Sequence, residues 1–119
     1  AAPDIVEFEE YGNKKASILV VAHGIVSAAA KAAVDARKEK GVAARLFRPI
    51  TLSPFPVEQL RKAAKGAKRI LVAESADAQL ARLVAHALCG HVKVPVIEYS
   101  RPSMGILSQE IESLVIRHV

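Results

Sequence analysis

The sequence predicts an α/β fold in which helices cover both faces of a mainly parallel sheet, a three-layer α/β/α sandwich. Short apolar runs alternate with helical patterns along the chain. The run at residues 18–22 consists of branched aliphatic residues and alanine, which is typical of a strand buried on both faces. Because parallel neighbours need helical crossovers, this alternation favours a parallel sheet.

Each element has its own local signals. The predicted strands are residues 4–11, 17–22, 43–48, 69–74 and 94–99. The predicted helices are residues 25–40, 57–65, 78–88 and a C-terminal helix that Ser108 caps. Gly41, Gly66 and Gly90 end the first three helices, and Asp77 is the expected N-cap of the third.

Length and composition limit the class of protein. The chain has 119 residues, 51% of them hydrophobic and 24% charged, which suits one globular domain. Its longest apolar runs are far shorter than the roughly 20 residues of a membrane span, so no membrane association is expected. One cysteine, Cys89, makes no internal disulfide or cysteine-rich metal site and suits the cytoplasm; we expect it in the core.

A basic cluster raises the question of nucleic-acid binding. Lysine and arginine number 17 against 12 acidic residues, and five of these cations lie within residues 61–69. Only 4% of residues are aromatic, so stacking platforms for bases are scarce. We interpret the cluster as the solvated face of a helix and expect no nucleic-acid partner.

Candidate site residues follow the predicted strands, because ligands of open parallel sheets bind beyond the carboxyl ends of the strands. They are His23, Gly24, Arg48, Pro49, Glu74 and Arg101. The turn at residues 22–27 has one glycine, whereas a dinucleotide loop needs three, and it lacks the lysine of a phosphate loop. Nucleotide binding is therefore disfavoured, and no catalytic pattern is complete.

Two of these residues have both a chemical and a structural interpretation. His23 with Ser27 suggests a base and a nucleophile, but a histidine bonded to a neighbouring loop, with Ser27 bonding free helix N–H groups, explains both more simply. Glu74, at the end of a buried strand, needs a cationic partner such as Arg48 or Arg101, or a helix N-terminus. We favour the cationic partner. The histidines lack the spacing of metal ligands, so no metal is expected.

A proline-rich link presents an aromatic residue before the second helix. Pro54 and Pro56 stiffen the loop around Phe55. Phe55 either packs into the core and fixes that helix or contacts a partner, and we favour the packing role.

These residues together resemble a known family, the thiamine-diphosphate-dependent 2-oxoacid:ferredoxin oxidoreductases. The resemblance is to the transketolase C-terminal-like domain of their alpha subunit. It rests on the strand and glycine turn at residues 18–24, on Leu-Phe-Arg-Pro-Ile-Thr-Leu-Ser-Pro-Phe-Pro at 46–56, on Ile-Leu-Val-Ala-Glu at 70–74 with Gln79, and on Arg-Pro-Ser-Met-Gly at 101–105. The chain departs from the family pattern at His23, Ser53, Ala76 and Ala78.

The resemblance implies a fold and a division of the chain. It implies a five-stranded mixed sheet whose first strand, about residues 5–10, runs antiparallel to the others. Residues 1–12 are then a linker and edge strand, and residues 13–119 the transketolase C-terminal-like domain. A chain that opens with Ala is also compatible with a piece cut from a longer protein.

The resemblance also implies a function that belongs to a larger enzyme. The family oxidatively decarboxylates a 2-oxoacid to an acyl-CoA and passes electrons through iron–sulfur clusters to ferredoxin. Thiamine diphosphate, magnesium and the clusters are expected in the parent complex, with a beta and possibly gamma and delta subunits, and the isolated domain is expected to be inactive. The expected contact residues are His23, Gly24, Arg48, Pro49, Phe55, Glu74, Gln79 and Arg101.

Two other functions remain open. The same fold occurs in transketolase-like thiamine enzymes, which need no electron acceptor. The other function is that of a free-standing domain, which would bind a small anion at Gly24, Ser27 and the helix N-terminus. Which 2-oxoacid is used, pyruvate, 2-oxoglutarate or a branched-chain acid, is not determined by the residues.

Overall fold

The structure, a computed structural model, describes residues 7–24, 26–50, 55–74, 79–100 and 108–118. Its strands are β1 (Phe8–Gly12), β2 (Ile18–Ala22), β3 (Arg45–Pro49), β4 (Arg69–Glu74) and β5 (Val96–Ser100). Its helices are α1 (Val26–Glu39), α2 (Val57–Ala64), α3 (Gln79–Leu88) and α4 (Ser108–His118). The predicted elements are confirmed in type and order.

The strands form one five-stranded sheet in the order β1-β3-β2-β4-β5. The pairs β2–β3, β2–β4 and β4–β5 are parallel, whereas β1 pairs antiparallel with β3. Phe8 lies opposite Pro49 and Gly12 opposite Arg45. The mixed sheet with an antiparallel first strand is therefore confirmed, although the described strand lies a few residues later than expected.

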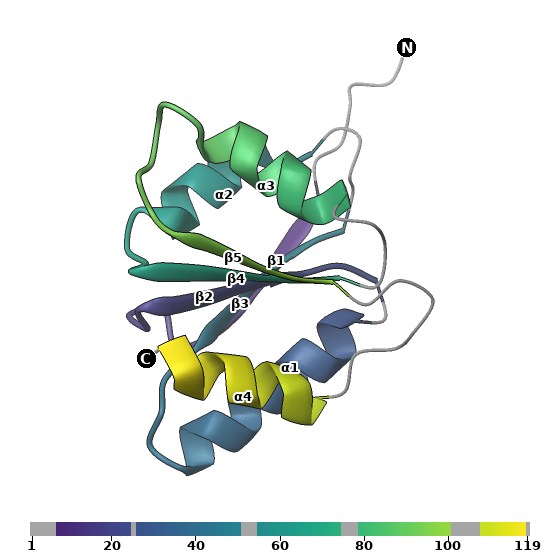
Figure 1. Cartoon of the computed structure of the whole chain (residues 1–119), viewed down its shortest axis with the longest axis vertical. Coiled ribbons are helices and arrows are strands. Elements are labelled where there is room, and N and C mark those ends of the chain that lie inside the picture. The colour runs from purple at the N-terminus through teal and green to yellow at the C-terminus, as the bar shows by residue number, and fades with distance from the viewer. Residues whose placement is uncertain (1–6, 25, 51–54, 75–78, 101–107, 119) are drawn as a thin grey trace.

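Helices cover both faces of the sheet, so the molecule has three layers. Helices α1 and α4 pack together on one face, and α2 and α3 pack together on the other (Figure 1). The alternate residues of β2 separate between the two apolar clusters: Ile18, Val20 and Ala22 face α1 and α4, while Leu19 and Val21 face α2 and α3. Because β2 is buried on both faces, residues 18–22 form one continuous apolar run.

An ion pair also joins the helices of one layer. The Arg37 guanidinium in α1 donates from Nη2 to Glu112 Oε1 of α4 at 2.7 Å. The Arg37 side chain is 9% exposed. This charge, at the last turn of α1, is therefore placed to hold the C-terminal helix against α1.

Several local expectations need correction or lie outside the described residues. Cys89 is exposed directly after α3, not buried in the core, because the preceding Leu88 fills the inward position of the helix. The proposed N-cap Asp77 lies outside the described residues. No described helix combines the length and the apolar stretch that crossing a membrane requires.

Candidate functional site

The two central strands end beside each other, and the chain then leaves them toward opposite faces. After β2 the chain enters α1 on one face, and after β4 it enters α3 on the other (Figure 1). This divergence is the topological switch point at which α/β sheets bind ligands or partners. The candidate residues His23, Gly24 and Glu74 therefore lie at or directly after adjacent strand ends, as the sequence predicts.

Glu74 is bonded inside the chain. Its side chain is buried, and its two carboxylate oxygens accept the backbone N–H groups of Leu80 and Ala81, each at 2.9 Å. These groups belong to the first turn of α3, where helix N–H groups have no partner within the helix. The carboxylate therefore caps α3 from the end of β4. Arg48, one of the two predicted cationic partners, bonds Glu9 instead, and the other, Arg101, lies outside the described residues. The helix N-terminus, the less favoured alternative, is confirmed as a partner of Glu74.

His23 completes the hydrogen bonding of a neighbouring strand. Its Nδ1 lies 2.9 Å from the carbonyl oxygen of Pro49, and because a carbonyl only accepts, Nδ1 carries the hydrogen. The β2–β3 pairing ends before Pro49, which leaves that carbonyl without a backbone donor from β2. The His23 imidazole therefore donates to this carbonyl at the point where the β2–β3 pairing ends. This bond confirms the structural interpretation of His23, and it uses Nδ1 and not Nε2.

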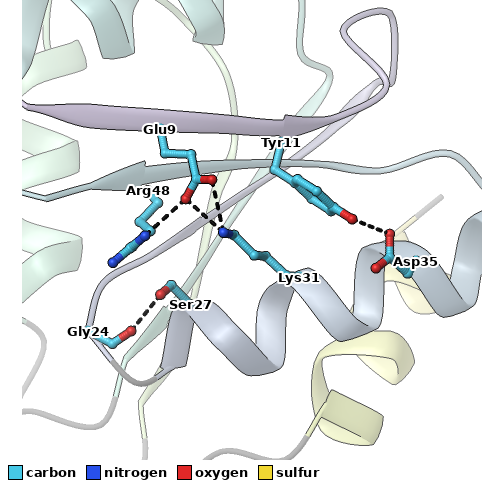
Figure 2. Close-up of polar contacts among 7 residues, drawn as sticks. All are labelled: Glu9, Tyr11, Gly24, Ser27, Lys31, Asp35 and Arg48. Atoms are coloured by element: carbon cyan, nitrogen blue, oxygen red, sulfur yellow. Dashed lines mark hydrogen bonds and ion pairs between the residues drawn. The ribbon is translucent and has the colours of Figure 1, made fainter.

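Ser27 has a different role from the one predicted. Its hydroxyl donates to the Gly24 carbonyl oxygen at 2.5 Å instead of accepting from a free helix N–H group (Figure 2). Its backbone N–H also donates to that carbonyl. Gly24 has a positive φ of 65°, which a tight turn between β2 and α1 requires. Both Ser27 bonds close this turn, and none of the described contacts joins Ser27 to His23 as a nucleophile joins a base.

Arg48 is held by the antiparallel edge strand. Its Nη1 donates to Glu9 Oε1 at 3.0 Å, and the Lys31 ammonium contacts the same carboxylate at 2.9 Å (Figure 2). The hydrogen bonds from Lys31 and Arg48 lower the pKa of the Glu9 carboxyl below its usual value. Glu9 thus joins β1, β3 and α1, and it holds Arg48 partly exposed beside the carboxyl end of β3.

A second polar contact on the same face fastens β1 farther along. The Tyr11 hydroxyl donates to Asp35 Oδ1 in α1 at 2.7 Å (Figure 2). This bond to a carboxylate raises the pKa of Tyr11, since ionisation would place two negative charges together. Lys31 also lies 5.5 Å from the centre of the Tyr11 ring. Sequence reasoning missed this network because its partners are far apart in the chain; the only signal was that Glu9 and Tyr11 share one face of a strand.

The remaining candidates differ in exposure. Phe55 is half-buried against the apolar cluster of α2 and α3, which supports its packing role. Gln79 opens α3 and is exposed, as is Gly24, whereas Pro49 is buried. Arg101 lies outside the described residues. The structure therefore brings His23, Gly24, Arg48, Pro49 and Glu74 to one end of the sheet, but it does not join them into one hydrogen-bonded cluster.

The described residues at this end show no metal site, and the sequence lacks a set of iron–sulfur ligands. Within the described ranges, no group of three or more His, Cys, Asp or Glu side chains is placed to hold a metal ion. One cysteine in the whole sequence falls short of the four thiolates that bind a common iron–sulfur cluster. The polar groups here bond to each other and to backbone instead.

Comparisons with known proteins identify sequences related to this chain. The family of pyruvate:ferredoxin oxidoreductase core domain II matches residues 16–112. The ketoisovalerate oxidoreductase subunit VorB of Methanothermobacter marburgensis is 43% identical over 75 residues, and that of Methanothermobacter thermautotrophicus 40%. Each match covers 63% of this chain and 21% of the relative, so the matched part spans about a fifth of the length of these relatives.

Solved structures share the fold at low identity. A split-gene transketolase superposes with a TM-score of 0.81 at 22% identity, over 93% of this chain and 40% of that one. A 2-oxoglutarate:ferredoxin oxidoreductase from Magnetococcus marinus gives 0.78 at 17% identity, over 93% and 19%. The fold is therefore common to both enzyme types, whereas the family match distinguishes them. The chain belongs to the pyruvate:ferredoxin oxidoreductase core domain II family.

Proposed function

We propose that this chain is one domain of a 2-oxoacid:ferredoxin oxidoreductase subunit and that it makes domain and subunit contacts instead of carrying the chemistry. The family match over residues 16–112 supports the enzyme class. The proposed contact surface is the carboxyl end of the sheet, with His23, Gly24, Arg48 and Gln79 as its accessible residues and Pro49, Phe55 and Glu74 as their support. Arg101 is the remaining proposed contact.

The observation that carries this proposal is how the polar groups at that end are used. Glu74 caps α3, His23 bonds Pro49, and Ser27 closes its own turn. A catalytic site instead needs a nucleophile or base directed at a substrate and oriented by a third group. The described contacts at this end support a contact surface better than a reacting one.

The proposal extends to the parent enzyme. Thiamine diphosphate, magnesium and iron–sulfur clusters are then bound by other parts of a cytoplasmic complex, which uses coenzyme A and reduces ferredoxin. We infer that the chain belongs to the alpha subunit of this complex, an assignment that rests on the sequence resemblance and not on the name of the VorB relatives. Its partners are the remainder of that chain and the beta subunit, with gamma or delta subunits where they exist.

Charge reversal at Arg48 tests the contact surface. Arg48→Glu in the full subunit is expected to reduce the fraction assembled with its partner subunits, measured by size-exclusion chromatography with light scattering. The substitution replaces a partly exposed cation with an anion, so the charge at this position no longer complements the partner surface. Lys38→Glu, an exposed position in the last turn of α1, is the matched control and should assemble normally.

A second variant separates contact from folding. Arg48→Gln keeps an N–H donor for Glu9 while it removes the charge, so circular dichroism should show a folded domain. Loss of assembly in both Arg48 variants with the fold intact supports the contact surface. Normal assembly and turnover in both variants would show that the carboxyl end makes no such contact.

A further inference from the structure

The opposite end of the molecule carries cations that the proposed function does not use. Strands β2 to β5 begin there, after the connections at residues 13–17, 40–44, 65–68 and 89–95, along the left side of Figure 1. These connections contain six lysines and no Asp or Glu. We define the basic end as these lysines and the arginine that opens β4: Lys14, Lys15, Lys40, Lys65, Lys68, Arg69 and Lys93.

The cations of the basic end are exposed and have no carboxylate partner. All seven side chains are exposed. Within the described ranges, none of them lies within ion-pair distance of an acidic group. By contrast, Lys31, Arg37 and Arg48 each contact a carboxylate elsewhere in the fold. Among the described residues, these seven cations are therefore not paired with a carboxylate.

Helix dipoles explain only part of this pattern. Cations are stabilised near helix C-termini, and α1, α2 and α3 all end on this side. That accounts for Lys40 and Lys65, which directly follow α1 and α2. The effect falls off within the last turn, so it does not account for Lys14, Lys68 or Lys93.

The surface at this end is hollowed on both sides of α2. A cavity of about 420 Å³ is lined by Lys14, Arg45 and Lys62, together with Glu10. A second of about 500 Å³ is lined by Lys62, Lys65 and His91, together with the ion pair of Arg61 and Glu58. Protruding acidic side chains fit such hollows, because the cations in each outnumber its one glutamate. A smooth anionic surface would use only the lysine tips.

The composition of the end favours a protein over a nucleic acid. The four connections contain no Phe, Tyr or Trp on which a base could stack. Two aromatic residues line the first hollow, but Phe8 stacks on Phe47 and Tyr11 bonds Asp35. Lysine predominates over arginine, whose planar fork is the better match for phosphate and base edges. We propose that the basic end is an electrostatically steered docking surface for an acidic protein. This inference does not rest on the proposed function.

Binding of acidic probes to the 119-residue chain and to the parent complex tests this proposal. The chain is suited to the test because its own apolar clusters cover both faces of its sheet. The probes are a glutamate-rich peptide and a single-stranded oligonucleotide of equal charge, measured by biolayer interferometry. We expect the peptide to bind more tightly and to weaken as salt rises from about 0.05 to about 0.2 M, since screening shortens the reach of the charges.

Two variants that change the net charge equally locate the surface. Lys14→Gln with Lys68→Gln removes two charges from the basic end, and Arg82→Glu changes the charge by the same amount at an exposed position of α3. The double variant should bind the peptide about 3- to 10-fold more weakly, and Arg82→Glu should bind within about twofold of the unsubstituted chain.

If both variants lost the same affinity for the peptide, binding would depend on net charge and not on the basic end, which would overturn the proposal. Tighter binding of the oligonucleotide would overturn the choice of a protein partner. Failure of the parent complex to bind the peptide would show the basic end to be covered in the assembly, which also contradicts it. In each case assembly and turnover of the parent enzyme remain a separate measurement, so the proposed function stands or falls independently.

Discussion

Glu74 shows how one residue of the candidate site serves the fold. A carboxylate at the end of a buried strand has two acceptor oxygens to satisfy, and the first turn of α3 supplies two N–H groups at 2.9 Å. The pairing satisfies the strand end and the helix start together. It also fixes the direction in which α3 leaves the switch point.

Glu74→Gln should therefore destabilise the domain. The glutamine amide has one acceptor oxygen, so its NH₂ group would face the second backbone N–H and leave that donor unsatisfied. The expected loss is about 1–3 kcal/mol in the free energy of unfolding, measured by urea denaturation. Glu98→Gln, at an exposed position of β5, is the control and should change stability by less than about 0.5 kcal/mol. Equal effects would show that the cap contributes nothing.

Single residues were predictable where the chemistry is local. A histidine and a glycine at a strand end predict a turn with a side-chain bond, and the structure confirms this for His23. The Glu9 network was not predictable, because its partners Lys31 and Arg48 are brought near only by the fold. For Glu74, Arg48 was favoured over the helix N-terminus that the structure shows, because backbone donors have no side-chain signal in the sequence.

At the scale of elements, β1 depends on a close approach at its end. Gly12 has a φ of 102°, and a Cβ there would lie 2.7 Å from the Ala44 carbonyl oxygen and 3.0 Å from Val34 Cγ1. Both neighbours are buried parts of the core beside α1 and β3. The strand therefore needs glycine for its conformation and for its space.

Gly12→Ala should destabilise the domain more than the matched variant Gly41→Ala. Gly41 also has a positive φ, 82°, but a Cβ there meets nothing within 4 Å. We expect about 1–2 kcal/mol for Gly41→Ala from conformation alone and about 2–5 kcal/mol for Gly12→Ala, which adds a backbone clash. The measurement is the free energy of unfolding in urea. If the two variants lost the same free energy of unfolding, the edge of the sheet would accommodate the Cβ of residue 12 with no loss of stability, which would contradict this prediction.

The elements themselves were largely predictable from periodicity. Continuous apolar runs and helical spacing identified β2, β4 and the helices, because each element buries the stripe that its pattern describes. The direction of β1 was different. Its residues are of mixed polarity and show no direction, so the antiparallel pairing came from the family resemblance and not from the local pattern.

At the scale of the molecule, the two ends of the sheet differ in character. The carboxyl end uses His23, Ser27 and Glu74 in internal hydrogen bonds. The other end carries lysines that have no carboxylate partner among the described residues. Both features suit a domain that works through contacts. The chain by itself should accordingly show no turnover of a 2-oxoacid.

The most direct test of membership in a ferredoxin-linked enzyme is affinity capture of the native protein from its own cells, with chain masses, iron and thiamine diphosphate measured on the captured material. The account predicts a chain heavier than 12.7 kDa, held with a partner subunit and carrying both iron and thiamine diphosphate. A lone chain of about that mass with neither, or a thiamine enzyme without iron, would contradict it.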